Sequence, residues 1–167
     1  SLVNSMDHPR VVLPFFGVDS KMFAFQGRAF GKEEPRYITI KLDENKRRIF
    51  GLDKVDINRK VYVVEGPIDS LFLPNCIAVA GADLNMSLKN AVYIFDNEPR
   101  NKQIVDKMQQ LIFLNKNICI FPKSLKHKDI NDMIMADMSQ VEIQTIIDNN
   151  TFSKLSAQHK LNDWKEI

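Results

Sequence analysis

Cysteines and long apolar runs are scarce in this sequence of 167 residues. Only Cys76 and Cys119 are present, each within a short apolar run, and there is no C-x-x-C pair. Isolated thiols of this kind are typical of buried cysteines in a reducing compartment, and they argue against a cysteine-based zinc site. No apolar run approaches the roughly 20 residues that span a bilayer, and no signal peptide is recognisable. The sequence therefore predicts a cytoplasmic protein with no membrane partner.

Several catalytic signatures are also absent. There is no G-x-x-x-x-G-K-[ST] loop, which excludes a P-loop helicase motor within the chain, and no G-x-S-x-G nucleophile elbow. The histidines His8, His127 and His159 lack the spacing of metal ligands. The chain begins SLVNS without an initiator methionine, so we expect it to be a fragment of a longer protein.

The charges are divided unevenly along the chain, although the formal net charge is only +2. Residues 1–60 carry 12 Lys and Arg against 8 Asp and Glu, whereas the remainder carries 11 against 13. A basic first third beside an acidic remainder suits the binding of a polyanion next to a metal site. Scattered, solvated surface charges would give the same totals, and charge alone leaves both interpretations open.

The hydrophobic pattern changes near residue 60. Before it, short runs such as RVVLPFF, KMFAFQGRAF, RYITIKL and RRIFGL are separated by turn signals, a pattern that predicts a small antiparallel β unit. After it, strands and helices alternate, which predicts an α/β fold with a mainly parallel, covered sheet. Ser139 and Glu142 form a capping box before a C-terminal helix, and a last helix is expected from about Ser153 to Trp164. We expect three regions, namely residues 1–60, 61–135 and 136–167.

The segment VYVVEGPIDSLFL, residues 61–73, places two carboxylates at one predicted strand-to-helix junction. Glu65 ends a run of residues that favour a buried strand, and Asp69 falls in the first turn of a helix expected to run through Phe72. Gly66 permits a sharp turn, and Pro67 suits the first helical position. A carboxylate at the end of a buried strand must be paired or bound to a cation, because an unpaired buried charge is costly.

The same pattern recurs after two later strands. Asp96 follows AVYIF, Glu98 stands two residues on, and Asp129 and Asp132 follow ICIFP. The carboxyl ends of parallel strands share one edge of a sheet, where ligands collect. Two carboxylates 4 Å apart repel each other by roughly 4 kcal/mol at an effective dielectric of about 20. A cluster of them therefore predicts a site for Mg²⁺ or Mn²⁺ and phosphoryl chemistry, although each acid alone suits a helix cap.

The motifs EGPIDSLFL, IFDNE and KDINDM resemble the Toprim signature of primases, topoisomerases and some nucleases. The upstream F-x-G-R and P-[KR]-Y elements, here Phe25 to Arg28 and Pro35 to Tyr37, resemble the basic subdomain of DnaG-type primase cores. The combination resembles the DNA primases of large tailed bacteriophages. The resemblance covers about Arg10 to Ile134, and it implies a Toprim-type catalytic core that makes short RNA primers on single-stranded DNA in a bacterial host cell.

The resemblance also implies roles for the acidic residues. Glu65 would be a metal ligand or the general base, and Asp69 would support the metal shell. Asp96, Glu98 and Asp129 would hold the divalent metals, Mg²⁺ or Mn²⁺, that carry the ribonucleoside triphosphate. Glu98 departs from the family pattern, which usually has Asp at that position.

The resemblance also implies residues that bind the nucleic acid or the nucleotide, with the arginines on phosphates of the template, the nascent strand or the triphosphate: Arg10, Arg28, Arg36 and Tyr37. The zinc-binding module of such primases is absent here and is expected elsewhere in the full-length protein, and a replicative helicase is an expected partner. A Toprim nuclease and a non-catalytic nucleic-acid-binding module remain as alternatives. A topoisomerase would need further domains, for which this chain has no room.

Overall fold

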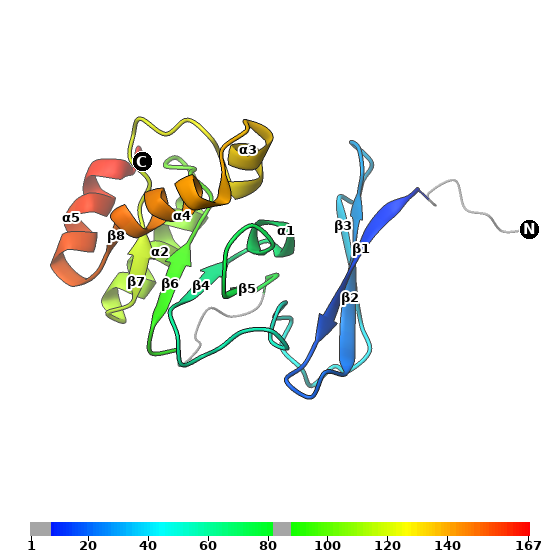
Figure 1. Ribbon diagram of the computed structural model, residues 1–167. Coiled ribbons are helices and arrows are strands. Elements are labelled where there is room, and N and C mark those ends of the chain that lie inside the picture. Colours follow the sequence, from blue (N-terminus) through cyan, green and yellow to red (C-terminus); the bar gives the residue numbers. More distant parts are fainter. Residues whose placement is uncertain (1–7, 82–87) are drawn as a thin grey trace, which may run out of the picture.

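Two sheets of different kinds lie side by side in the computed structural model, which describes residues 8–81 and 88–167 (Figure 1). The first is antiparallel, with β1 (Arg10–Phe16), β2 (Met22–Ala29) and β3 (Tyr37–Lys41) in sequence order. This confirms the antiparallel unit that the alternating runs predict. Because successive side chains alternate between faces, the row formed by Val11, Arg28 and Tyr37 lies on one face.

The second sheet has the order β5-β4-β6-β7-β8 and is mostly parallel. Its strands are β4 (Val61–Val64), β5 (Cys76–Ala78), β6 (Ala91–Ile94), β7 (Asn117–Cys119) and β8 (Thr151–Phe152). Only β8 runs antiparallel to its neighbour, and the sequence analysis did not foresee it. Every residue of β4 and β6 is buried, as expected for parallel strands covered on both faces.

Helices cover both faces of this second sheet (Figure 1). On one side α2 (Lys102–Phe113) and α5 (Lys154–Trp164) bury a core that includes Met108 and Leu161. On the other side α3 (Ile130–Met135) and α4 (Gln140–Asn149) contribute Met133 and Ile143. The short α1 (Pro67–Ser70) follows β4. The layers are therefore helix, sheet and helix, which confirms the predicted α/β class.

Local details show where the sequence was a good guide. The capping box of Ser139 and Glu142 is present at the start of α4, and Pro67 occupies the first turn of α1. The helix α1 ends at Ser70, two residues before the expected Phe72, because Leu71 and Phe72 continue only as a turn. The run RRIFGL, residues 47–52, forms no strand. Phe50 instead makes a single antiparallel bridge to Ala78 on β5.

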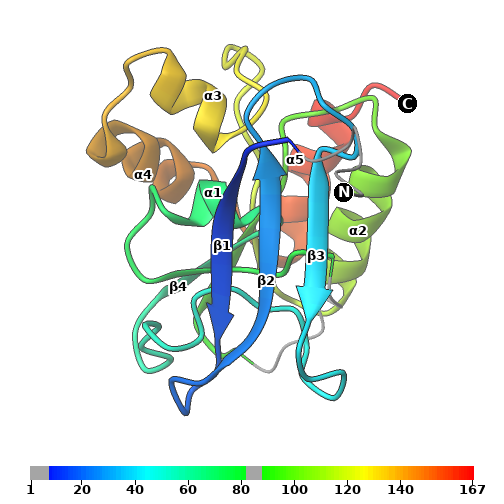
Figure 2. The same ribbon diagram turned by 90° about the vertical axis from the view of Figure 1, so that its right-hand side faces the viewer.

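The two sheets are joined by an aromatic contact. Phe15 on β1 is fully buried, and its ring meets that of Phe50 edge-on with centroids 5.3 Å apart. Phe23 packs on the other side of Phe15 with centroids 6.2 Å apart. Edge-on aromatic pairs favour one relative orientation, so this contact helps to fix the antiparallel sheet against the rest of the molecule. Figure 2 shows this sheet in front of the parallel one.

Among the described residues, no helix combines the length and the apolar character required to cross a membrane.

Candidate active site

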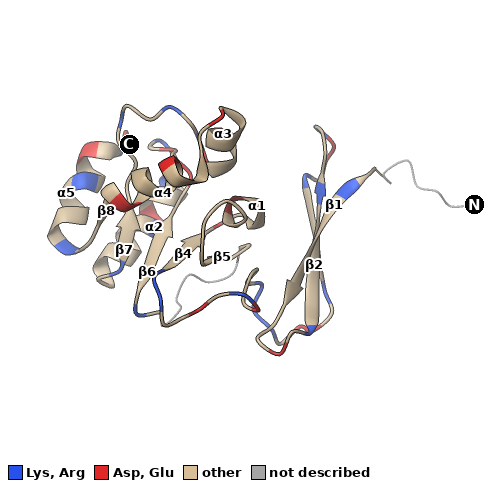
Figure 3. Cartoon of the chain, in the orientation of Figure 1, with Lys and Arg blue, Asp and Glu red and all other residues tan. Residues whose placement is uncertain are grey.

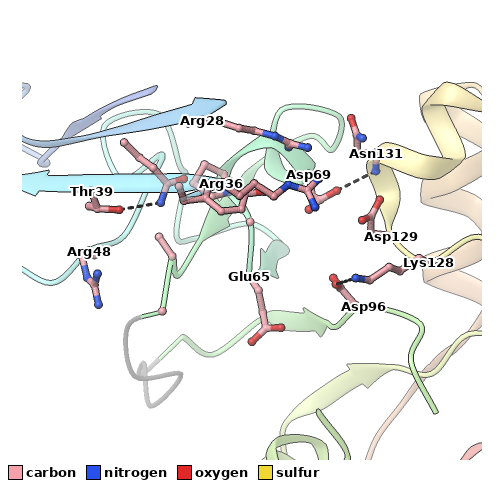
Figure 4. Close-up of a pocket in the computed structure, with 16 residues that line it drawn as sticks. Arg28, Arg36, Thr39, Arg48, Glu65, Asp69, Asp96, Lys128, Asp129 and Asn131 are labelled. Atoms are coloured by element: carbon pink, nitrogen blue, oxygen red, sulfur yellow. Dashed lines mark hydrogen bonds and ion pairs between the residues drawn. The ribbon is translucent and has the colours of Figure 1, made fainter. Parts of the chain in front are cut away.

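A cleft of about 460 Å³ lies between the two sheets, at the carboxyl end of the parallel strands (Figure 4). One wall is the inner face of β2 and β3, and the other is formed by the segments that follow β4 and β6 and by the start of α3. The charged side chains lining it are Arg28, Arg36, Arg48, Glu65, Asp69, Asp96, Lys128 and Asp129. Most of the acidic and basic residues that the sequence analysis selected are therefore brought together.

Glu65 stands where the sequence analysis places it, directly after β4. Its carboxylate is turned away from Asp69 and Asp129, as Figure 4 shows. It forms an ion pair with the ammonium group of Lys107, which extends from α2. The lysine therefore supplies the positive charge that a carboxylate at the end of a buried strand requires.

Asp69 is held in place by the backbone of α3. Its Oδ1 accepts a hydrogen bond of 2.9 Å from the backbone N–H of Asn131. Gly66 has an ordinary extended backbone with φ −96° and ψ 133°, so the sharp turn expected there does not use the conformational freedom of glycine. A Cβ atom at this position would instead lie 2.8 Å from Oδ2 of Asp69. The missing side chain makes room for the carboxylate.

Two of the acids share an environment that disfavours negative charge. Burial raises the pKa of Asp69 to about 6; the hydrogen bond from Asn131 offsets part of this increase, and the charge of Asp129 adds to it. Burial likewise raises the pKa of Asp96 to about 6, and the charges of Asp129, Asp69 and Glu65 add to it while Lys128 opposes it. Asp129 also caps α3, because its Oδ1 accepts from the backbone N–H of Asp132 at 2.7 Å.

Glu98 does not line the cleft. One of its carboxylate oxygens lies 3.5 Å from Nζ of Lys128, and the other accepts a long hydrogen bond of 3.4 Å from the side chain of Asn101. The same ammonium group lies 3.8 Å from Asp96. Lys128, in the loop before α3, thus bridges Asp96 and Glu98, which together with Asn97 form a D-x-E motif.

The opposite wall of the cleft is basic. The guanidinium carbons of Arg28 and Arg36 lie 5.5 Å and 5.8 Å from the centroid of the Tyr37 ring. The positive charge of Arg28 acts to lower the pKa of Asp69, so the two walls interact electrostatically. Figure 3 shows basic positions at the end of the β1–β3 sheet that faces the acidic positions of α1 and α3.

Arg10 lies outside this arrangement. Its row in the antiparallel sheet, paired with Ala29, is next to the row of Val11 and Arg28, so Arg10 projects from the opposite face. Its stem covers Gly27, where an added Cβ would be 3.2 Å from Cδ of Arg10, and its guanidinium donates to the backbone oxygen of Pro35 at 2.8 Å. Arg10 therefore has a visible structural role away from the cleft.

The donor chemistry of the cleft fits a hard divalent cation. Carboxylate oxygens are the ligands that Mg²⁺ and Mn²⁺ prefer, and a cation would relieve the unfavourable negative charge at Asp69 and Asp96. Within residues 8–81 and 88–167, however, no three Asp, Glu, His or Cys side chains are close enough together to hold an ion. The side chains present are suitable in kind, and three of them would have to move closer together to share one ion.

Several lining residues escaped the sequence analysis, among them Arg48, Lys128, Asn131 and Gln26. Arg48 and Lys128 stand in lysine- and arginine-rich segments, which gave a weak signal because such segments are usually solvated. Asn131 contributes its backbone N–H, which no side-chain motif can reveal. Gln26 lies on β2 and is buried, and its amide donates to Thr39 Oγ1 at 3.0 Å.

No family model matches the chain. Over 169 residues it is 36% identical to the DNA primase of Enterobacteria phage T4, an alignment that covers 97% of this chain and 49% of that protein. The chain thus spans about half the length of this curated relative. The homology confirms the predicted resemblance to phage DNA primases.

Solved structures of primase cores share the fold. The Escherichia coli primase catalytic core superposes with a TM-score of 0.64 at 17% identity, covering 92% of this chain and 55% of that one. A DnaG primase catalytic domain bound to single-stranded DNA superposes with a TM-score of 0.62 at 16% identity, covering 84% of this chain and 51% of that one. These likenesses confirm the predicted architecture of a DnaG-type core.

Proposed function

We propose that this homologue of the phage T4 DNA primase is the catalytic core of a primase, which joins ribonucleotides into short RNA primers on a single-stranded DNA template. The observation that carries the proposal is the 36% identity to that primase over 97% of the chain. The cleft supports it independently, because it sets carboxylates against guanidinium groups, the two kinds of side chain that phosphoryl transfer requires.

The acidic wall would hold the metals. Asp69, Asp96 and Asp129 line the cleft, and Mg²⁺ or Mn²⁺ bound there would neutralise the triphosphate and lower the barrier to attack by a 3′-hydroxyl. Glu65 and Glu98 stand at the edge of this wall, and each is paired with a lysine in the structure. We assign Glu65 the role of metal ligand or general base, and Glu98 the role of a further ligand.

The basic wall would hold the nucleic acid and the nucleotide. Arg28, Arg36 and Arg48 present guanidinium groups to the cleft, and such groups bind phosphate in a bidentate manner. The ring of Tyr37 contacts two of them, Arg28 and Arg36, through cation–π interactions. A structural relative of this chain binds single-stranded DNA, which supports the same ligand here.

Lys107 and Lys128 would offset part of the negative charge of the acidic wall until substrate arrives. Each ammonium group contacts carboxylates that the proposal assigns to metal binding. Glu98 and Asp96 raise the pKa of Lys128, although its partial burial acts in the opposite direction. With these carboxylates engaged in holding a metal, Lys107 and Lys128 would lose their present partners, and Lys128 would be placed to contact the triphosphate.

The proposal also includes a second module and a protein partner. A zinc-binding module would help to choose the start site, and a replicative helicase would deliver the template. The proposal also locates the chain in the cytoplasm of a bacterial host, where the template is made. The catalytic core alone is then expected to extend an existing primer better than it starts a new one.

The test is ribonucleotide incorporation on single-stranded DNA, with and without an annealed RNA primer, in Mn²⁺ or Mg²⁺. We expect Glu65→Gln to reduce incorporation by a factor on the order of 10² or more, because the proposal makes this carboxylate a metal ligand or the general base. Glu44→Gln is the matched control, since Glu44 is exposed and pairs only with Lys41.

Each result has a defined meaning. Metal-dependent incorporation that Glu65→Gln abolishes and Glu44→Gln preserves supports the proposal. Cleavage of labelled DNA without incorporation would point to a nuclease instead. Absence of incorporation under every condition, or equal activity of wild type and Glu65→Gln, would overturn the assignment.

A further inference from the structure

Asn97, the middle residue of the D-x-E motif, makes a set of hydrogen bonds that neither the motif nor the proposed function assigns. We propose that Asn97 and Trp164 are positioning residues, which hold the loop of Asp96 and Glu98 and the loop of Lys128 and Asp129 as one unit. This inference rests on the proposed function for its catalytic meaning. Its structural basis is independent of that function.

Asn97 joins two loops through every donor that it has. Its backbone N–H donates to the carbonyl oxygen of Lys128 at 2.6 Å. Its side-chain Nδ2 donates to the carbonyl oxygens of Leu125 and His127 at 3.0 Å and 3.1 Å. Residues 122–129 contain no helix or strand, so these bonds replace the regular pairing that would otherwise fix the segment.

Trp164 determines which way the amide of Asn97 points. It is the last residue of α5 and is 5% exposed, and its indole N–H donates to Oδ1 of Asn97 at 3.1 Å. An amide turned by 180° would present its oxygen to the two loop carbonyls and its NH₂ group to the indole N–H. Both contacts would be repulsive, because acceptors would face acceptors and donors would face donors. The indole therefore selects the productive orientation.

The end of α5 is tied to the same loop at two further points. The backbone N–H of Glu166 donates to the carbonyl oxygen of Pro99 at 2.9 Å, and its carboxylate pairs with Arg100 at 2.8 Å. The loop that carries Asp96 and Glu98 and the loop that carries Lys128 are therefore both connected to the C-terminal helix α5. This gives α5 a role at the active site, beyond packing on the sheet.

The consequence is that the backbone that carries Asp96 and Glu98 is held in a fixed position relative to the backbone that carries Lys128 and Asp129. Groups that orient metal ligands without touching the metal affect its affinity by about 10- to 100-fold in other proteins. Loss of the amide of Asn97 should therefore weaken metal binding as well as turnover. A purely structural role would lower the stability and leave the metal affinity of the folded protein unchanged.

The experiment compares Asn97→Ala, Trp164→Phe and the double variant with wild type. Mn²⁺ binding is measured by electron paramagnetic resonance, and primer extension gives kcat and KM for the ribonucleotide. Trp164→Phe removes the N–H while keeping an aromatic ring in the buried site. Tyr62→Phe is the control, because Tyr62 is 1% exposed and its hydroxyl donates to Asp148 at 2.7 Å, at the other end of β4 from Glu65.

We expect Asn97→Ala to raise the Kd for Mn²⁺ by about 10-fold or more and Trp164→Phe to raise it by a smaller factor. The double variant should be no worse than Asn97→Ala, since both act through one amide. Tyr62→Phe should lower the stability and leave the Kd unchanged. If Asn97→Ala does not fold, Trp164→Phe and Tyr62→Phe decide the question.

The inference is overturned if Trp164→Phe and any folded Asn97 variant bind Mn²⁺ like Tyr62→Phe. Mn²⁺ binding requires no turnover, so an enzyme that never extends a primer would refute the proposed function while this comparison still tests the anchor. Weakened Mn²⁺ binding in the Asn97 and Trp164 variants supports the anchor whether or not the protein proves to be a primase.

Discussion

The two walls of the cleft are built in different ways. The acidic wall grows from β4 and β6, in which all four residues of each strand are buried. The basic wall grows from β2 and β3, and every residue of β3 is exposed or only partly buried. The acidic wall is therefore carried by strands of the hydrophobic core, whereas the basic wall is carried in part by a strand, β3, that lies at the surface.

This difference suits the chemistry proposed for each wall. Metal ligands must be placed to within a fraction of an ångström, and strands packed on both faces by helices supply that rigidity. Arginines that follow a nucleic acid backbone benefit from long side chains on an open sheet, because phosphates shift as the template moves. The comparison teaches that the same cleft should respond differently to mutation on its two sides.

The largest difference is expected in stability, for the same substitution made on either sheet. Ile118 on β7 is fully buried, whereas Ile40 on β3 is 45% exposed. Ile118→Ala should lower the free energy of unfolding by about 2–5 kcal/mol, because it leaves a cavity in the core. Ile40→Ala should cost less than about 1 kcal/mol. Urea denaturation measures both, and equal losses would remove the distinction between the walls.

A smaller effect is expected from neutralising the acidic wall. The pKa of Asp69 and of Asp96 is about 6 in the folded protein, against the ordinary value of 3.8. The folded state binds these protons more tightly, so the free energy of unfolding should fall as pH rises from about 4 to 6. The variant Asp69→Asn with Asp96→Asn should thus be more stable than wild type at about pH 7.5, by on the order of 1–2 kcal/mol.

The measurement is urea denaturation in the presence of a chelator at two pH values. The gain should shrink at about pH 4, where both acids are mostly protonated in the folded wild type. Asp106→Asn serves as the control, because Asp106 is half-exposed and pairs with Lys102 on the same helix. A double variant less stable than wild type at neutral pH would show that these carboxylates stabilise the metal-free fold, contrary to the expectation.

The sequence was a good guide to the elements and to the location of the acids. Strand-end positions are readable because β-branched runs stop abruptly at Glu65 and near Asp96, and both acids do line the cleft. The capping box at Ser139 is a local interaction and was predicted correctly. Features that depend on neighbouring residues in the sequence, such as the ends of strands and the helix cap, were therefore the ones predicted correctly.

The directions of side chains could not be foreseen in the same way. Whether Arg10 shares a face with Arg28 depends on the register of β1 and β2, and that register is set by tertiary packing. The pairing of Glu65 with Lys107 joins residues 42 positions apart, and the anchor from Trp164 to Asn97 spans 67. Such contacts follow from how α2 and α5 pack on the sheet, which periodicity alone does not give.

The most direct test of the central claim is a crossed binding experiment. Mn²⁺ binding and single-stranded DNA binding would each be measured for wild type, Asp96→Asn, Arg28→Ala and the control Arg10→Ala. We expect Asp96→Asn to lose Mn²⁺ affinity and keep DNA affinity, and Arg28→Ala to do the reverse, with a salt dependence of DNA binding reduced by about one unit of slope. Arg10→Ala should change neither affinity, because Arg10 projects from the other face of the sheet. If Asp96→Asn and Arg28→Ala each impaired both affinities equally, or if neither changed any, the division of the cleft into a metal wall and a nucleic acid wall would be contradicted.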